Sequence, residues 1–231
     1  MPDVSKLVRR TLANGLEVLL YPTFDAPVAT FQVWYRVGSR DELPGMTGAS
    51  HWVEHMMFKG TEKIGPGEVM LQVNQNGGEL NAFTSYDFTA YHEKMPADRI
   101  AMAIAIEADR MIGLLMDREQ TESERTVILS ERQGALNNPS YLLWDETIGL
   151  AFREHSYGHF VIGTEHDLKR MSRDDLFGHY QMYYAPNNAV VVVAGAFDAD
   201  SIMTEIERAF GAIPATPVIG RTTVDEPRQA A

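Results

Sequence analysis

The sequence contains no cysteine among its 231 residues. Disulfide bonds and thiolate metal sites are therefore excluded, and a bound metal would have to rely on histidine and carboxylate ligands. Basic residues are also scarce, since 20 Lys and Arg stand against 32 Asp and Glu, a formal net charge of -12. This balance argues against a nucleic-acid surface, which needs clustered cations to neutralise phosphates. The acidic surface could favour basic peptides or simply keep the protein in solution.

Long apolar runs are missing as well. The longest, at 189–197, is far too short to cross a bilayer and predicts a buried strand. The first twelve residues include Asp3, Lys6 and Arg9 and contain no apolar core of a signal peptide. We therefore expect no membrane segment and a cytoplasmic location, unless a presequence has been removed.

The local patterns alternate between strands and helices. Asn14-Gly15 predicts a hairpin turn inside 9–23. Further strand patterns and helical spacings follow along the chain, the strands at 28–37, 79–84, 88–95 and 189–195, and the helices at 46–58, 67–76, 98–115, from 121, 141–153, 173–184 and 201–210. Hairpins mixed with helices indicate an α+β fold, a largely antiparallel β-sheet flanked by helices, and not a doubly wound parallel sheet.

The sharpest motif is His51-Trp52-Val53-Glu54-His55. On a helix, positions i and i+4 share a face, so both imidazoles can reach one ion. Glu54 projects close to the same side, where its carboxylate can take the proton of a water molecule that zinc activates. The alternative is two histidines on a helix surface beside an acidic residue.

A catalytic zinc site needs a third protein ligand and an open fourth position. The helix expected from Thr121 offers Glu122, Glu124 and Glu131. Glu124 and Glu131 are seven residues apart and lie on one face, about 10 Å apart along the axis. Glu124 could instead close a capping box with Thr121, and Glu131 could form a surface ion pair with a neighbouring arginine.

The inverted H-x-x-E-H motif resembles that of the inverzincins, the family of pitrilysin, insulysin and mitochondrial processing peptidase. Three further blocks of this sequence match the family, at 77–84 (Gly-Gly-Glu-Leu-Asn-Ala-Phe-Thr), 157–164 (Tyr-Gly-His-Phe-Val-Ile-Gly-Thr) and 184–188 (Tyr-Ala-Pro-Asn-Asn). The resemblance covers residues 8–214. It implies a zinc-dependent metalloendopeptidase that hydrolyses unfolded or short polypeptides.

The resemblance also implies roles for individual residues. The third zinc ligand of the family corresponds to Glu131, beside His51 and His55, and a functionally important second glutamate corresponds to Glu124, which would orient the ligands or water. The family's edge strand, which pairs with extended substrate, corresponds to 80–84. Asn81 and Ala82 are the substrate-binding candidates there, and the alternative is an interior strand.

Members of this family are clamshells built from two homologous halves. The resemblance therefore implies that residues 1–213 form one catalytic half of a clamshell metallopeptidase. The polar, non-periodic residues 214–231 would be a linker towards an absent second half, in the same polypeptide or in a separate subunit. An isolated half exposes its site to bulk water, so we expect it to bind zinc but to cleave peptides weakly.

Two other functions compete with the peptidase. The chain could be a non-catalytic partner or scaffold subunit of a two-half complex, although all four key positions are present. A purely structural zinc module is a poorer fit, because structural sites usually close with four protein ligands. The second histidine pair, His155 and His159, is separated by Ser-Tyr-Gly and predicts a structural loop.

Overall fold

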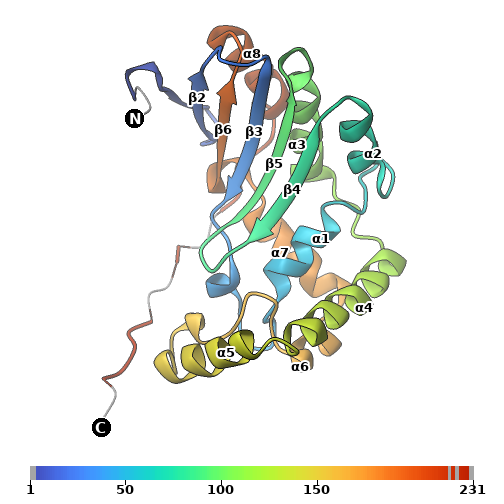
Figure 1. Cartoon of the computed structure of the whole chain (residues 1–231), viewed down its shortest axis with the longest axis vertical. Helices are drawn as coiled ribbons and strands as arrows, with labels where there is room; N and C mark the ends of the chain where they lie inside the picture. The colour runs from blue at the N-terminus through green and yellow to red at the C-terminus, as the bar shows by residue number, and fades with distance from the viewer. Residues whose placement is uncertain (1–3, 218–219, 222–223, 229–231) are drawn as a thin grey trace.

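The structure is a computed structural model of the chain, and it describes residues 4–217, 220–221 and 224–228. Its six strands form one sheet (Figure 1), with bounds β1 Val8–Thr11, β2 Glu17–Pro22, β3 Val28–Tyr35, β4 Glu79–Thr84, β5 Thr89–Pro96 and β6 Ala189–Gly195. Their spatial order is β1-β2-β6-β3-β5-β4. Every neighbouring pair is antiparallel except β2 and β6. The predicted α+β fold with a largely antiparallel sheet is confirmed.

The chain's helices leave one face of the sheet more open than the other. Their bounds are α1 Ala49–Met56, α2 Glu68–Gln75, α3 Ile100–Gly113, α4 Arg118–Ala135, α5 Pro139–Ala151, α6 Glu165–Arg170, α7 Arg173–Tyr183 and α8 Ala199–Phe210. Helix α3 contacts β3 and β5, and α8 contacts both α3 and β2. Alternate residues of the central strand β3, such as Phe31, Val33 and Tyr35, are fully buried, while the residues between them are half-buried. This alternation is typical of a sheet that packs on one side.

The buried face of the sheet contains an ionic cluster that periodicity does not reveal. Glu93 of β5 and Glu107 and Arg110 of α3 are at most 1% exposed. The Arg110 guanidinium donates to both carboxylates, with 3.2 Å between its Nη2 and Glu93 Oε1. It also lies 4.6 Å from the centre of the Tyr91 ring. Burial first, and the neighbouring Glu107 second, raise the pKa of Glu93 well above its ordinary value.

The main differences from the predicted helices are the start of α4 and an additional helix, α6. Helix α4 begins at Arg118 and not at Thr121, because the Asp117 side chain accepts the N–H groups of Glu119 and Gln120 and so acts as the N-cap. The capping box proposed for Thr121 and Glu124 is therefore wrong. The short helix α6 was not predicted, although the Thr164 hydroxyl oxygen caps it by accepting the Asp167 N–H.

The helices that carry the H-x-x-E-H motif and the downstream glutamates meet below the sheet (Figure 1). Helix α1 contacts β4, α4 and α7, and α4 in turn contacts α6. Within the described part of the chain, no helix combines the length and apolar character needed to cross a membrane. The expected linker 214–231 forms no helix or strand where it is described, and its positions 218–219, 222–223 and 229–231 lie outside the described residues.

Candidate metal centre and active site

Helix α1 begins at a glycine, which has no side chain to cap the first N–H groups of the helix. Its N-cap is Gly48, in the left-handed conformation, and Thr47 instead donates its hydroxyl to Asp167 at 2.6 Å. The free N–H groups of Gly48 and Ser50 are both accepted by the buried carboxylate of Glu42, each at 2.8 Å. Glu42 thus satisfies the start of the helix from an earlier turn of the chain.

The two histidines of the motif face the same side of α1. Their ring centres are 4.6 Å apart and the ring planes are inclined by 68°. Trp52, between them in sequence, is fully buried and anchors the helix in the core. One helical turn therefore presents two imidazoles together, as the i, i+4 spacing predicted.

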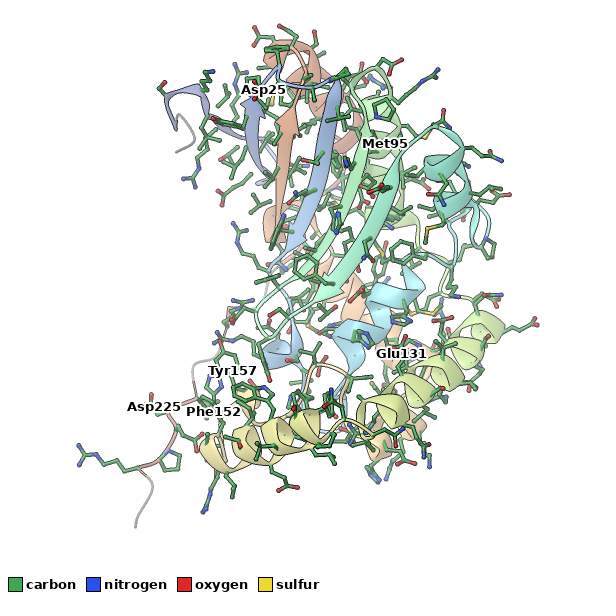
Figure 2. All side chains as sticks on the ribbon, viewed as in Figure 1. Asp25, Met95, Glu131, Phe152, Tyr157 and Asp225 are labelled. Carbon is green, nitrogen blue, oxygen red and sulfur yellow. The ribbon has the colours of Figure 1, made fainter. Side chains whose placement is uncertain are left out.

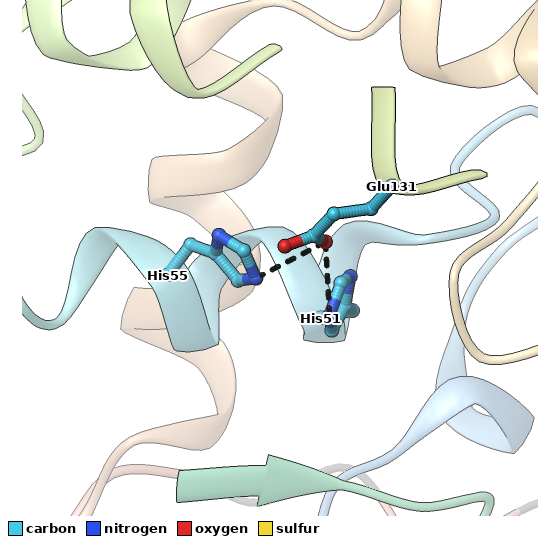
Figure 3. A group of neighbouring side chains, drawn as sticks. All are labelled: His51, His55 and Glu131. Atoms are coloured by element: carbon cyan, nitrogen blue, oxygen red, sulfur yellow. Dashed lines mark ion pairs between the residues drawn. The ribbon is translucent and has the colours of Figure 1, made fainter. Parts of the chain in front are cut away.

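Glu131 of α4 reaches the same point from the other helix (Figure 3). Its Oε2 lies 3.6 Å from His55 Nε2 and 4.0 Å from His51 Nε2. All three ligand atoms lie within 4.8 Å of one another. Ligands about 2.0–2.2 Å from a tetrahedral zinc ion are themselves roughly 3.3–3.6 Å apart, so the group needs only a small contraction to hold one. Among the described residues no arginine pairs with Glu131, which does not favour the alternative of a surface ion pair.

Glu124 contacts His55 on the ring nitrogen that faces away from Glu131. Its Oε2 is 2.8 Å from His55 Nδ1, and its Oε1 is 2.5 Å from Lys59 Nζ. Burial would raise the pKa of Glu124, but the hydrogen bonds from Lys59 and His55 outweigh it, so the pKa is lowered and the carboxylate stays charged. A charged acceptor at Nδ1 keeps the proton on that nitrogen and leaves Nε2 free as a ligand.

The donor set fits zinc. Two imidazole nitrogens and one carboxylate oxygen are the ligands of a borderline-soft cation, and only three of the four tetrahedral positions are filled by protein. Burial, followed by the nearby His55, lowers the pKa of His51 to about 4. The imidazole is then neutral at physiological pH, which is the form that binds a metal.

Glu54 lies beside the three-residue group without belonging to it. Its side chain is 8% exposed, and its carboxylate accepts a hydrogen bond from the Thr84 hydroxyl at the end of β4. Burial raises the pKa of Glu54 above its ordinary value. A pocket of about 400 Å³ is lined by His51, Glu54 and Glu131 together with Ala82, Phe83, Thr84, Ala135, Tyr141, Phe160, Val161 and Ile162. The arrangement places the Glu54 carboxyl group and two of the three candidate metal ligands in one cavity.

Strand β4 forms one wall of this pocket and is an edge strand of the sheet. Ala82 lines the pocket, whereas Asn81 is exposed and turns its side-chain oxygen onto the Ala82 N–H at 2.9 Å. The Ala82 N–H therefore points away from β5, toward the open edge. An interior position for this strand, the alternative considered from the sequence, is excluded by the strand order.

Sequence reasoning missed several residues that the fold brings to the site. Lys59 and the stacked pair Tyr141 and Phe160, whose ring centres are 4.2 Å apart, were assigned no role. Thr84 was expected only as part of the substrate-pairing strand and not as a partner of Glu54. Phe160 belongs to a recognised sequence block, so that block was a usable signal. His155 and His159 flank a 3-10 turn away from the metal-binding group, in agreement with the predicted loop.

The sequence and the fold are similar to those of known proteins. Residues 18–165 match the family profile described as Insulinase (Peptidase family M16). The chain belongs to the M16 peptidase family. Residues 170–231 match the profile described as Peptidase M16 inactive domain.

The M16 relatives include proteins named as zinc proteases. An uncharacterized zinc protease of Streptomyces coelicolor is 32% identical over 225 residues, which is 94% of this chain and 49% of that protein. The mitochondrial-processing peptidase subunit beta of Lentinula edodes is 32% identical over 88% of this chain and 44% of its own length. The crystal structure of a protease from Helicobacter pylori superposes with a TM-score of 0.94 at 30% identity, over 97% of this chain and 55% of that one. The chain thus spans about half the length of these M16 proteins.

Proposed function

We propose that the chain is the zinc-binding, catalytic half of an M16 metalloendopeptidase. His51, His55 and Glu131 would hold the zinc ion, Glu54 would serve as the base, and Glu124 would position His55. The observation that carries this proposal is the convergence of three ligand atoms within 4.8 Å beside a pocket that also contains the Glu54 carboxylate. The M16 relatives named zinc proteases support the same chemistry.

Glu54 is placed to move a proton. A bound zinc ion would supply polarisation of the scissile carbonyl and acidification of the attacking water. The Glu54 carboxylate takes the proton from that water and can return it to the departing amine. The Thr84 hydroxyl holds one carboxylate oxygen and so limits the orientations that Glu54 can adopt.

The open edge of β4 would bind the substrate. An extended peptide can pair with the free main-chain groups of this strand irrespective of its side chains, which suits a peptidase for unfolded or short polypeptides. Ala82 offers its N–H on this edge, and the Asn81 side chain that now occupies the N–H would have to swing away. Asn81 and Ala82 are thus our substrate-binding residues.

A second homologous half would complete the enzyme. The chain covers about half the length of its relatives, which leaves room in them for a second half of similar size. We therefore expect the 231-residue chain alone to bind zinc but to cleave peptides weakly, because water exclusion and substrate positioning are incomplete.

The deciding experiment compares wild type with Glu54→Gln. Zinc is measured by metal analysis after dialysis, and cleavage of a quenched fluorescent peptide mixture is measured in the chain and in any longer polypeptide that contains it. We expect unchanged zinc content and a loss of cleavage of about 10²–10⁴-fold, the usual contribution of a general base. Glu119→Gln, an exposed acid on α4 remote from the pocket, is the matched control. Full cleavage by zinc-loaded Glu54→Gln would refute the mechanism, whereas no cleavage by the zinc-loaded wild type in either polypeptide would favour a non-catalytic partner subunit.

A further inference from the structure

The end of the described chain returns to the body of the molecule and binds it. The Glu226 carboxylate accepts three consecutive backbone N–H groups, those of Arg153 at 2.7 Å, Glu154 at 3.1 Å and His155 at 2.9 Å. Successive N–H groups that converge on one point form an anion-binding nest. Figure 2 shows the neighbouring Asp225 close to Phe152, at the foot of the molecule beside α5.

A second anchor lies five residues earlier. Arg221 Nε is 3.1 Å from Asp41 Oδ1, and its guanidinium also donates to the main-chain oxygen of Asp87. Asp87 in turn accepts hydrogen bonds from Arg40 at 2.8 Å and from the Tyr157 hydroxyl at 2.9 Å. One anchor thus holds the backbone of 153–155, and the other joins the β4–β5 turn to the same loop through Tyr157.

The anchored loop continues into the proposed active site. Its residues 160–162 line the site pocket. Gly163 then packs backbone to backbone against the start of α1, where a Cβ on it would lie 2.1 Å from the Thr47 carbonyl oxygen. The Thr164 N–H also donates to the Thr47 hydroxyl at 3.0 Å. Glu226 is therefore connected through one short loop to the first turn of the helix that carries His51.

The helix before this loop is itself only weakly buried. None of the residues of α5 is buried, and Leu143, Trp144 and Leu150 are more than half exposed. The loop is held instead by the stack of its Phe160 on Tyr141, by the Tyr157 hydroxyl that donates to Asp87, and by the backbone N–H groups that bind Glu226.

We propose that the nest formed by the N–H groups of Arg153, Glu154 and His155 is a docking site for an acidic side chain of the C-terminal segment, and that docking positions the pocket-lining loop. The C-terminal segment means here the described residues Gly220, Arg221 and 224–228. Glu226 and Arg221 are positioning residues that act on the pocket through the loop 152–163. The hydrogen bonds from His155 and Arg153 also lower the pKa of Glu226, so its carboxylate is charged at neutral pH.

Hydrogen exchange of the 231-residue chain tests the docking directly. In Glu226→Ala we expect severalfold faster exchange of the amides of 153–155 and of 160–163, with an intermediate effect in Glu226→Gln, which keeps one uncharged acceptor. Asp225→Asn is the matched control, because Asp225 is exposed and makes no hydrogen bond or ion pair with the described residues. Arg221→Ala and Arg228→Ala form a second matched pair. Unchanged exchange at 153–155 in Glu226→Ala, or an equal effect in Asp225→Asn, would overturn the docking.

The effect on catalysis rests on the proposed function, whereas the exchange result does not. In zinc-loaded protein we expect Glu226→Ala to raise KM more than it lowers kcat. The reason is that the loop residues 160–162, which line the pocket, become less well fixed while Glu54 and the proposed zinc ligands stay in place. Zinc content and melting temperature report whether the fold and metal site are retained. Faster exchange with an unchanged KM would overturn the positioning role, while cleavage by Glu54→Gln would overturn the peptidase mechanism alone.

Discussion

Replacing Arg110 by methionine should destabilise the protein in a strongly pH-dependent way. Arg110 is the cation that contacts both Glu93 and Glu107, and all three side chains are essentially without solvent exposure. Methionine fills much of the same volume but leaves two carboxyl groups in the core with no counter-charge. Removing one partner of a buried ion pair typically costs about 3–5 kcal/mol.

The pH dependence follows from protonation. In the wild type, burial and the neighbouring Glu107 raise the pKa of Glu93, and Arg110 lies against both carboxyl groups. In the variant no cation remains beside these groups, so the core no longer tolerates a carboxylate and a carboxyl group must take up a proton to stay buried. For a group with an unfolded pKa of 4.5 this costs about 3.4 kcal/mol near pH 7 but only about 0.7 kcal/mol near pH 5. A folded pKa above the unfolded one gives stability that is complete below pH 4.5 and is lost as pH rises.

Urea denaturation of wild type and Arg110→Met at the two pH values measures this difference. We expect the variant's deficit to be about 2.7 kcal/mol larger near pH 7 than near pH 5. Adding Glu107→Gln to the variant should remove most of that pH dependence, because one carboxyl group is then absent. Arg99→Met, at an exposed arginine, should change stability by no more than about 0.5 kcal/mol. Equal deficits at both pH values would refute the reasoning.

Two further predictions concern the support of the metal-binding group. Glu124→Gln should weaken zinc binding about 10- to 100-fold in a chelator competition, because the amide cannot accept hydrogen bonds from both His55 and Lys59. The control is Glu122→Gln, since the Glu122 carboxylate pairs with Arg125. An equal loss of zinc binding in this control would show that the effect does not pass through His55. Glu42→Ala should lower the free energy of unfolding by about 1–3 kcal/mol, because the Gly48 and Ser50 N–H groups lose their acceptor in a buried setting. Glu62→Ala, which changes an exposed acidic residue, should have little effect. A similarly small change for Glu42→Ala in urea denaturation would contradict the capping role.

The pairing of His51 and His55 could be predicted from sequence because their relationship is local. His51 and His55 are one helical turn apart, so any helix through this region places them together. The choice between Glu124 and Glu131 could not be made the same way. They lie on one face of α4 two turns apart, and only the crossing of α4 over α1 decides that Glu131 meets both Nε2 atoms while Glu124 meets Nδ1 of His55. The resemblance to known peptidases supplied that distinction before the structure did.

Long-range contacts account for the remaining differences. The start of α4 was misplaced because Asp117 and Thr121 are both acceptable caps, and propensity alone does not rank them. The ionic cluster in the core was missed because Glu93 and Arg110 belong to different elements, and a glutamate on a strand ordinarily predicts a solvent-facing position. The nest that holds Glu226 is made of backbone groups, which leave no trace in residue identity.

The contact between Gly48 and Gly163 has a consequence for how this protein tolerates change. Both glycines have positive φ, and a methyl group on either would collide with the backbone of the opposite segment. A Cβ on Gly48, for example, would lie 2.5 Å from the Ile162 carbonyl oxygen. A saturation library should therefore accept glycine alone at these two positions, whereas Gly134 and Gly178, with open space around them, should accept many residues. The junction between the pocket loop and the first turn of α1 would then tolerate almost no substitution, although neither residue carries any chemistry.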